Sequence, residues 1–283
     1  MEKKDGIELS IVIPTIGRKK EVIALFESVL STNLNVSYEI IVIDQNEDNL
    51  IDEICKKYKK SLPITQYKVQ FKGASKARNY GIEKARGKIA CFPDDDAEFS
   101  GNTVVAALYS LKKTKADCVF GKVIDKKNGK DVVMKFRSDS MFLSLDNFEG
   151  AFVEATMYAY VELLKKYPYD ENMGVGTIRG SEEAYDLVYR LLKDRKVIYY
   201  DPTIIYYHPD KIIEKSSDSE IRRAFYYSCG YGYLCKKHKF EKKYKKRARK
   251  LTFGIPVIAV LRNRELKYFM AQWMGLRLGY KYL

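Results

Sequence analysis

Three consecutive carboxylates, Asp94, Asp95 and Asp96, are the residues best suited to do chemistry. They follow the apolar run 88–92 and Pro93, at the end of a predicted strand. Adjacent carboxylates repel one another unless a cation compensates. Hard oxygen ligands suit Mg²⁺ or Mn²⁺, ions that often bridge a diphosphate. Because side chains at i and i+2 of an extended segment share a side, Asp94 and Asp96 are placed to face one ligand. The alternative is a solvated acidic turn.

Three more polar residues end predicted strands. Thr15 and Asp44 follow the apolar runs 9–14 and 39–43, and His208 follows 203–207. A carboxylate at the position of Asp44 either accepts hydrogen bonds from a ligand or caps the next helix. His208 is predicted as a third metal ligand, and the alternative is a surface or hydrogen-bonded histidine.

Two helix starts also carry candidate residues. Small residues from Gly73 onward let a ligand approach the backbone, and Arg78 adds a charge there; the alternative is an ordinary helix start with Ser75 as N-cap. Glu182 and Glu183 follow the glycine-rich loop 174–180. They are either the acids expected in a first helical turn or a general base presented by the loop.

The elements that must position these residues alternate along the first half of the chain. Apolar runs predict strands, and apolar residues spaced i, i+3, i+4, i+7 predict helices. The predicted strands are 9–14, 39–43, 65–69, 88–92 and 117–120, and the predicted helices are 18–32, 51–58, 75–85 and 104–111. This alternation indicates βαβ units and a parallel sheet, with a ligand at the carboxyl ends of the strands. Further strands are predicted over 151–158, 196–200 and 203–207, and a helix over 181–194.

The charge is concentrated near the C-terminal end. The chain has 283 residues and a net charge of +14, and residues 236–250 hold ten Lys or Arg against the single acid Glu241. Such a run indicates an anionic partner, either nucleic acid or the inner leaflet of a membrane, or else a solvated helix face. The apolar run 251–261 is too short to span a bilayer.

The cysteines and the N-terminus predict a cytoplasmic protein. Five cysteines without a C-x-x-C pair indicate reduced, mostly buried thiols and argue against a structural zinc site. The charged N-terminus leads straight into a strand, so no signal peptide is expected.

Taken together, these motifs resemble the GT-A-fold, family-two inverting glycosyltransferases over roughly residues 8–210. The segments that carry the resemblance are SIVIPT at 10–15, EIIVID at 39–44, GASKARNYG at 73–81, ARGKI at 85–89, FPDDD at 92–96, YDENMG at 169–174, GSEE at 180–183, DL and RL at 186–191, YDP at 200–202 and HP at 208–209.

The resemblance implies a role for each candidate. It places Thr15 and Asp44 on the nucleotide base, Arg78 in support of it, and Asp94 on the ribose. It also implies Mn²⁺ or Mg²⁺ on Asp96, and Glu183 as the catalytic base with Glu182 beside it. The complete implied nucleotide site is Pro14, Thr15, Asp44, Gly73, Arg78, Asp94 and Asp95, and the metal group is Asp94, Asp96 and His208.

Two positions depart from the family pattern. Gln45 follows Asp44, where the family often has a second Asp. One extra residue separates the acid pair from Asp186-Leu187, which leaves the choice between Glu182 and Glu183 open.

The predicted fold class is α/β: a GT-A domain over 1–214, with halves 1–121 and 122–214, followed by a basic helical region over 215–283. The predicted reaction moves a sugar, by default from a UDP-sugar, with inversion to a hydroxyl of a glycan or lipid-linked acceptor in cell-surface polysaccharide synthesis. The protein is expected in the cytoplasm, peripheral on the inner face of the membrane. The sequence specifies neither the donor sugar, the acceptor, the linkage nor the oligomeric state.

Two other functions compete with this one. A sugar nucleotidyltransferase would want a Gly-rich basic loop after the first strand, whereas residues 14–18 hold only Gly17. A nucleic-acid-binding module would explain the charge of +14. The acidic triplet would repel the phosphates of a nucleic acid unless metal is bound, so no nucleic-acid partner is expected.

Overall fold

The computed structural model describes residues 6–32, 34–210 and 213–283. These divide into two compact units, which we describe separately. The sheet unit comprises the described residues of 1–71, 77–168 and 187–210. The helical unit comprises those of 72–76, 169–186 and 211–283.

The sheet unit is built on one sheet, nine-stranded within the described residues, in the order β3-β2-β1-β4-β8-β6-β9-β5, with β7 paired to β9. Its first four strands are parallel, and β8 enters antiparallel between β4 and β6. The strands are β1 (Leu9–Thr15), β2 (Tyr38–Asp44), β3 (Ile64–Lys68), β4 (Ile89–Cys91), β5 (Glu98–Phe99), β6 (Cys118–Ile124), β7 (Met141–Phe142), β8 (Tyr158–Tyr160) and β9 (Ile198–Tyr207).

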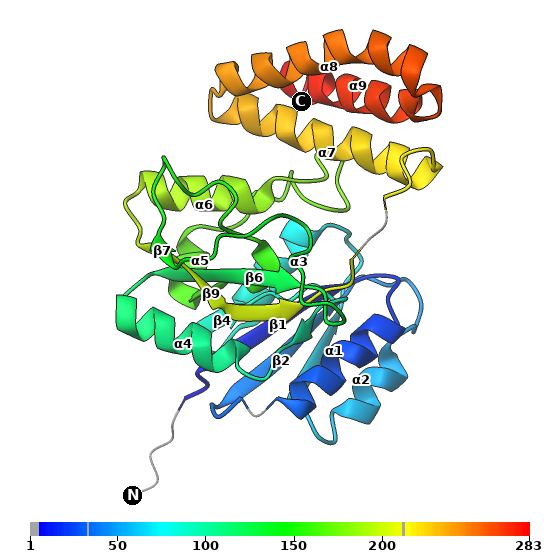
Figure 1. Ribbon diagram of the computed structural model, residues 1–283. Helices are drawn as coiled ribbons and strands as arrows, with labels where there is room; N and C mark the ends of the chain where they lie inside the picture. Colours follow the sequence, from blue (N-terminus) through cyan, green and yellow to red (C-terminus); the bar gives the residue numbers. More distant parts are fainter. Residues whose placement is uncertain (1–5, 33, 211–212) are drawn as a thin grey trace, which may run out of the picture. The chain divides into compact units, whose positions relative to one another are not determined.

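Helices flank this sheet (Figure 1). The predicted spacing is confirmed in α1, where Val22, Leu25, Phe26 and Val29 are all buried. Gly81 of α3 lies so close to Val12 of β1 that a Cβ there would clash. The helices with residues in the sheet unit are α1 (Lys20–Ser31), α2 (Asp52–Tyr58), α3 (Ala74–Lys84), α4 (Thr103–Thr114), α5 (Val161–Lys166) and α6 (Glu183–Lys193).

Three of the predicted strands differ from the structure. The segment 151–158 forms a short 3-10 helix, Glu154–Thr156, before β8, because the Thr156 hydroxyl donates to the Val153 carbonyl and accepts from the Gly121 amide. The predicted strands 196–200 and 203–207 are one strand, β9, which continues through Pro202. A shift in the β6–β9 register between Phe120 and Lys122 accommodates the irregularity.

The C-terminal part of the helical unit consists of α7 (Asp218–Lys237), α8 (Glu241–Leu261) and α9 (Leu266–Lys281), which run alongside one another (Figure 1). The Ser217 hydroxyl caps α7 by accepting from the Glu220 amide. Gly275 and Gly279 let the backbones of α9 and α7 approach, because a Cβ at either would meet a carbonyl of α7. None of the described helices has the length and apolarity needed to cross a bilayer. All five cysteines are buried and free of disulfides, as predicted.

Candidate functional site

The sheet topology brings the predicted polar residues to one edge. The chain winds from β1 outward to β2 and β3, then returns to place β4 on the other side of β1. Ligands bind at such a switch point, beyond the carboxyl ends of the strands. Thr15 ends β1 opposite Asp44 at the end of β2, and the turn after β4 carries Asp94 to Asp96. The Thr15 hydroxyl donates to Asp95 Oδ2 at 2.8 Å.

Asp94, Asp96 and His208 form a candidate metal group. Each offers a ligand atom, and these atoms lie within 4.8 Å of one another. His208 directly follows β9, which runs parallel to β6 and whose end pairs with β5, the short strand just after the acidic turn. This pairing brings His208 to the acidic turn. His208 Nε2 is 3.1 Å from Asp96 Oδ1. Two carboxylates and an imidazole are a donor set that suits Mn²⁺ or Mg²⁺.

The orientation of His208 strengthens this assignment. Its Nδ1 is 2.9 Å from the Pro209 carbonyl oxygen, which can only accept, so Nδ1 carries a proton and donates. In the neutral ring the Nε2 lone pair therefore faces the carboxylates, as in histidine ligands held by a backbone carbonyl. Burial opposes protonation of this ring, but the hydrogen bond and charge of Asp96 outweigh it and raise the pKa of His208 above its ordinary value.

Arg18 also contacts the acidic turn, and the motif analysis assigned it no role. Its Nη2 lies 3.1 Å from Asp96 Oδ2, and its Nε lies 3.8 Å from Asp95 Oδ1. Burial raises the pKa of Asp95 to about 6, although the hydrogen bond from Thr15 and the charge of Arg18 act in the opposite direction. The signal for Arg18 was its place just beyond β1, at the same strand edge.

Arg78 reaches the same turn from α3. Its Nη2 is 3.5 Å from Asp94 Oδ1, and its Nη1 pairs with Glu154 Oε2 at 2.7 Å. Both side chains of this second pair are nearly buried, at 6% and 10% exposure. Glu154 is a site residue that the sequence analysis missed, because its segment was predicted as a strand and not as a 3-10 helix.

Asp44 is fully buried and holds its surroundings in place. Its Oδ1 accepts from the Asn46 amide nitrogen at 3.0 Å and from Asn46 Nδ2 at 2.7 Å, while Oδ2 accepts from Gln66 Nε2 at 2.8 Å. Asn46 in turn accepts from the Gly17 amide at 2.7 Å. Asp44 thus orders the loops after β1 and β2, and a direct contact with a nucleotide base stays a prediction.

In the helical unit, a glycine lies against the candidate catalytic acid. Glu183 is 8% exposed and begins α6. A Cβ at Gly174, whose φ is +98°, would lie 3.1 Å from Glu183 Cδ and 2.8 Å from Ser75 Oγ. Glu182 has a φ of +74°, a left-handed conformation that is uncommon for a non-glycine residue. Strain of this kind clusters at functional sites.

Gly73 lies against the same loop. The Ala74 amide donates to the Val175 carbonyl at 2.8 Å, and a Cβ at Gly176 would lie 2.9 Å from Gly73 Cα. Glycine at 73, with a φ of +129°, allows this close approach. The structure thus places Gly73 beside the glycine-rich loop 174–180 of the helical unit.

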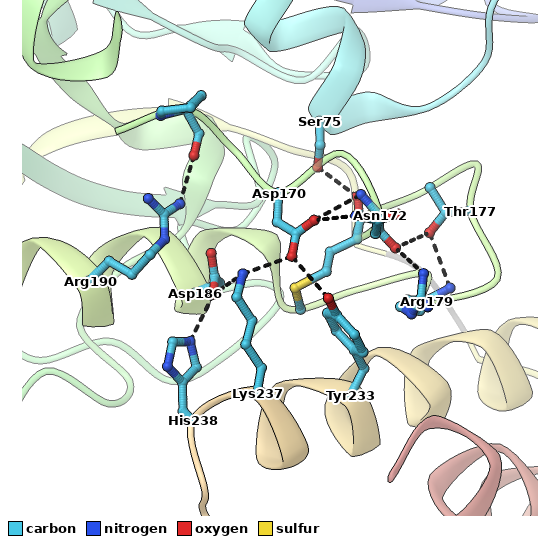
Figure 2. Close-up of polar contacts among 12 residues, drawn as sticks. Ser75, Asp170, Asn172, Thr177, Arg179, Asp186, Arg190, Tyr233, Lys237 and His238 are labelled. Carbon is cyan, nitrogen blue, oxygen red and sulfur yellow. Dashed lines mark hydrogen bonds and ion pairs between the residues drawn. The ribbon is translucent and has the colours of Figure 1, made fainter. Parts of the chain in front are cut away.

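An ion network centred on the buried Asp186 holds this loop and the first turn of α6 to α7 (Figure 2). Lys237 Nζ lies 2.7 Å from both Asp170 Oδ2 and Asp186 Oδ1, and His238 Nε2 is 2.7 Å from the latter atom. Asp186 is fully buried. Burial would raise the pKa of Asp170, but its bonds from Lys237 and Asn172 prevail and lower it. The network orients the helical turn that carries Glu183.

A family model described as glycosyl transferase family 2 matches residues 10–180. An uncharacterized glycosyltransferase of Rickettsia bellii is 35% identical over 38% of this chain, but over only 15% of its own length. Poly(ribitol-phosphate) beta-N-acetylglucosaminyltransferase TarP of Staphylococcus aureus is 24% identical, over 58% of this chain and 51% of its own.

Solved structures match nearly the whole chain. The crystal structure of S. aureus TarS 1–349 in complex with UDP-GlcNAc has a TM-score of 0.60 and 16% identity, covering 97% of this chain and 91% of that one. Mannosyltransferase PcManGT from Pyrobaculum calidifontis, in complex with GDP-Man and Mn²⁺, has a TM-score of 0.56 and 14% identity, covering 96% and 72%. These likenesses confirm the predicted fold: a GT-A α/β sheet with flanking helices, followed by C-terminal helices.

Proposed function

Because the chain belongs to glycosyl transferase family 2 and is a glycosyltransferase, we propose that it transfers a sugar from a UDP-linked donor to an acceptor hydroxyl with inversion. The observation that carries the proposal is the group of Asp94, Asp96 and His208, whose ligand atoms lie within 4.8 Å at the carboxyl edge of the sheet. The UDP-GlcNAc bound by TarS, a relative with the same fold, supports the choice of nucleotide.

Asp94, Asp96 and His208 would hold Mn²⁺ or Mg²⁺. When bound, this cation supplies positive charge that stabilises the diphosphate leaving group. The Mn²⁺ in the PcManGT complex supports that choice of ion. Arg18, 3.1 Å from Asp96, adds a fixed positive charge beside the group.

The other predicted residues would bind the nucleotide. We assign Thr15 and Asp44 to the base, Arg78 to its support and Asp94 to the ribose. The buried pair of Arg78 and Glu154 fixes the guanidinium beside Asp94. Pro14, Gly73 and Asp95 complete the proposed set.

Glu183 would act as the general base that takes the proton of the acceptor hydroxyl. General base catalysis contributes about 10²–10⁴-fold. Attack from the side opposite the diphosphate then inverts the anomeric carbon in one displacement, without a covalent glycosyl-enzyme. The glycine contact over Glu183 and the strained backbone at Glu182 support this part of the chain as the base, and Glu182 is the alternative.

The acceptor would be a glycan, a polymer or a lipid-linked saccharide of the cell surface. The names of TarS and TarP, poly(ribitol-phosphate) beta-N-acetylglucosaminyltransferases, support a polymer acceptor. The basic run 236–250 supports a location on the inner face of a membrane.

Release of nucleoside diphosphate from a panel of nucleotide sugars, with Mn²⁺ or Mg²⁺, tests the proposal. Slow hydrolysis by water would reveal the donor even without the acceptor. Asp96→Ala is expected to abolish both turnover and metal-dependent UDP binding measured by calorimetry.

Glu183→Gln is expected to lose about 10²–10⁴-fold in turnover and to keep donor binding, because it removes only the base. An inactive Glu182→Gln beside an active Glu183→Gln would transfer the role to Glu182. Full activity in both variants would contradict the assignment of the base to this pair.

A further inference from the structure

Several cations of the basic run 236–250 pack within the helical unit. Lys237 bridges Asp170 and Asp186, and Lys243 Nζ lies 2.6 Å from the Tyr185 hydroxyl. The Arg247 guanidinium lies 4.4 Å from the ring centre of Tyr231. The charge of the run therefore serves partly to hold α7 and α8 in place. An exposed apolar surface begins where the basic run ends.

The second half of α8 displays apolar side chains to solvent. Residues 251–261 contain no charged residue. Phe253 is 75% exposed, Val257 54%, Val260 83% and Leu261 74%. Positions 253, 257 and 260 follow the spacing of one helical face. Exposed apolar residues scattered singly are ordinary, whereas a contiguous stripe of them marks an interaction surface.

Cations accompany this stripe. Arg262, Arg264 and Lys267 follow it directly and are exposed, and Arg249 and Lys250 precede it. The only acid in residues 242–283 is Glu265, which pairs with Lys215 at 3.2 Å and, more weakly, with Arg262 at 3.9 Å. An apolar stripe between two cationic ends complements a surface of hydrocarbon lined by phosphates.

We infer that the segment 249–267, which we call the α8 tip, docks on an anionic lipid surface. Phe253, Val257 and Val260 enter the boundary between headgroups and acyl chains, and the flanking cations contact lipid phosphates. This deepens the membrane location within the proposed function, and it does not depend on sugar transfer. An inserted stripe, unlike a purely electrostatic contact, retains part of its binding when salt screens the charges.

The protein has its own reporter for this contact. Trp273 is the single tryptophan, and its Nε1 donates to Thr252 Oγ1 at 3.0 Å. Its ring therefore lies against the turn of α8 where the stripe begins. Insertion of the α8 tip is expected to shift Trp273 emission to the blue and to make it quenchable by brominated acyl chains.

Flotation of the full-length protein with vesicles tests the inference. We expect recovery with phosphatidylglycerol-containing vesicles at about 0.1 M salt, partial recovery at about 0.5 M, and little with pure phosphatidylcholine. The triple variant Phe253→Ser, Val257→Ser, Val260→Ser is expected to lose the binding that persists at high salt. Its partition coefficient is expected to fall by about tenfold or more. The variant Arg262→Glu, Arg264→Glu, Lys267→Glu is expected to lose the dependence on anionic lipid.

A matched control removes exposed apolar residues elsewhere. Val105 and Tyr109 lie on α4 of the sheet unit and are comparably exposed, so Val105→Ser with Tyr109→Ser is expected to leave flotation unchanged. Circular dichroism and diphosphate release establish that each variant is folded.

Two outcomes would overturn the inference. One is equal recovery of the triple variant and the unaltered protein at both salt concentrations, with unchanged Trp273 emission. The other is a wild-type dimer that becomes monomeric in the triple variant while flotation stays the same, because the stripe would then be an interface between two copies of the chain. If the unaltered protein floats with the vesicles but transfers no sugar from any donor, the proposed function is contradicted and the inference on the α8 tip is not.

Discussion

Replacing His208 by Ala tests the metal group through its coupling to protons. The Pro209 carbonyl fixes Nδ1 as the protonated nitrogen, so a cation at Nε2 must displace any proton held there. The pKa of His208 is raised above 6.5. Below that pKa, the affinity for Mn²⁺ is therefore expected to fall about tenfold per pH unit. In His208→Ala this part of the slope disappears, and the affinity itself falls by about 10–100-fold or more, the loss seen even for an outer partner of a metal ligand.

The stability of the metal-free protein should change with pH in the opposite direction. The pKa of His208 in the folded protein lies above its ordinary value of 6.5. The pairing of His208 with Asp96 therefore makes its full contribution to stability at pH values below 6.5. This contribution is lost as the pH rises through the folded pKa. The pKa of Asp95 is raised from 3.8 to about 6, so its contribution to the free energy of unfolding also falls as the pH rises between those two values. The stabilisation of the protein by Mn²⁺ should therefore grow as pH rises.

Calorimetry in two buffers of different ionisation enthalpy counts the protons released per Mn²⁺ bound. Near the pKa of His208, we expect the unaltered protein to release more protons than His208→Ala does, by up to about one. Equal proton release and equal affinity in the two proteins would remove His208 from the metal group. A lowered melting temperature with normal Mn²⁺ affinity would assign it a structural role instead.

Two further substitutions probe the nucleotide edge and the loop beside Glu183. Glu154→Gln keeps a hydrogen bond to Arg78 but removes the charge, which costs about 1–2 kcal/mol. We therefore expect the donor KM to rise by about tenfold with little change in kcat. An unchanged KM would contradict the role of the pair. Gly174→Ala is expected to lower kcat while sparing UDP binding, because its Cβ would press on Glu183 and Ser75. Gly129→Ala is its control, since Gly129 also has a positive φ but no atom within 4 Å of its Cβ.

Local sequence patterns were sufficient to predict the first half of the fold. The apolar runs that end at Thr15 and Asp44 are buried parallel strands, as their lack of polar alternation requires. Because parallel strands end at one edge, the same patterns placed Thr15 and the acidic triplet together. His208 joined them only through β9, whose pairing with β5 and β6 is a long-range contact that no local pattern reveals.

The helical unit was less predictable for the same reason. Residues 72–76 and 169–186 cluster with the C-terminal helices, although about 25 or more residues separate each from them along the chain. Lys237 lies 2.7 Å from both Asp170 and Asp186, a contact between distant segments that no local pattern predicts. The basic run 236–250 predicted either an anionic partner or a solvated helix face. It could not show that some of its cations face protein acids and aromatic rings.

The contacts of the acidic triplet reduce the repulsion among its three adjacent carboxylates. Arg18 Nη2 lies 3.1 Å from Asp96 Oδ2, and His208 Nε2 lies 3.1 Å from Asp96 Oδ1, so both oxygens of the proposed metal ligand already have a nitrogen partner within the chain. Burial raises the pKa of Asp95 to about 6, so below that pH the carboxyl is mostly neutral and the repulsion within the triplet is smaller. A divalent ion must compete with these groups, and it does so best at a pH where His208 has lost its proton. We therefore expect the protonation of His208 and Asp95 to set the pH range in which the proposed metal group binds a divalent ion.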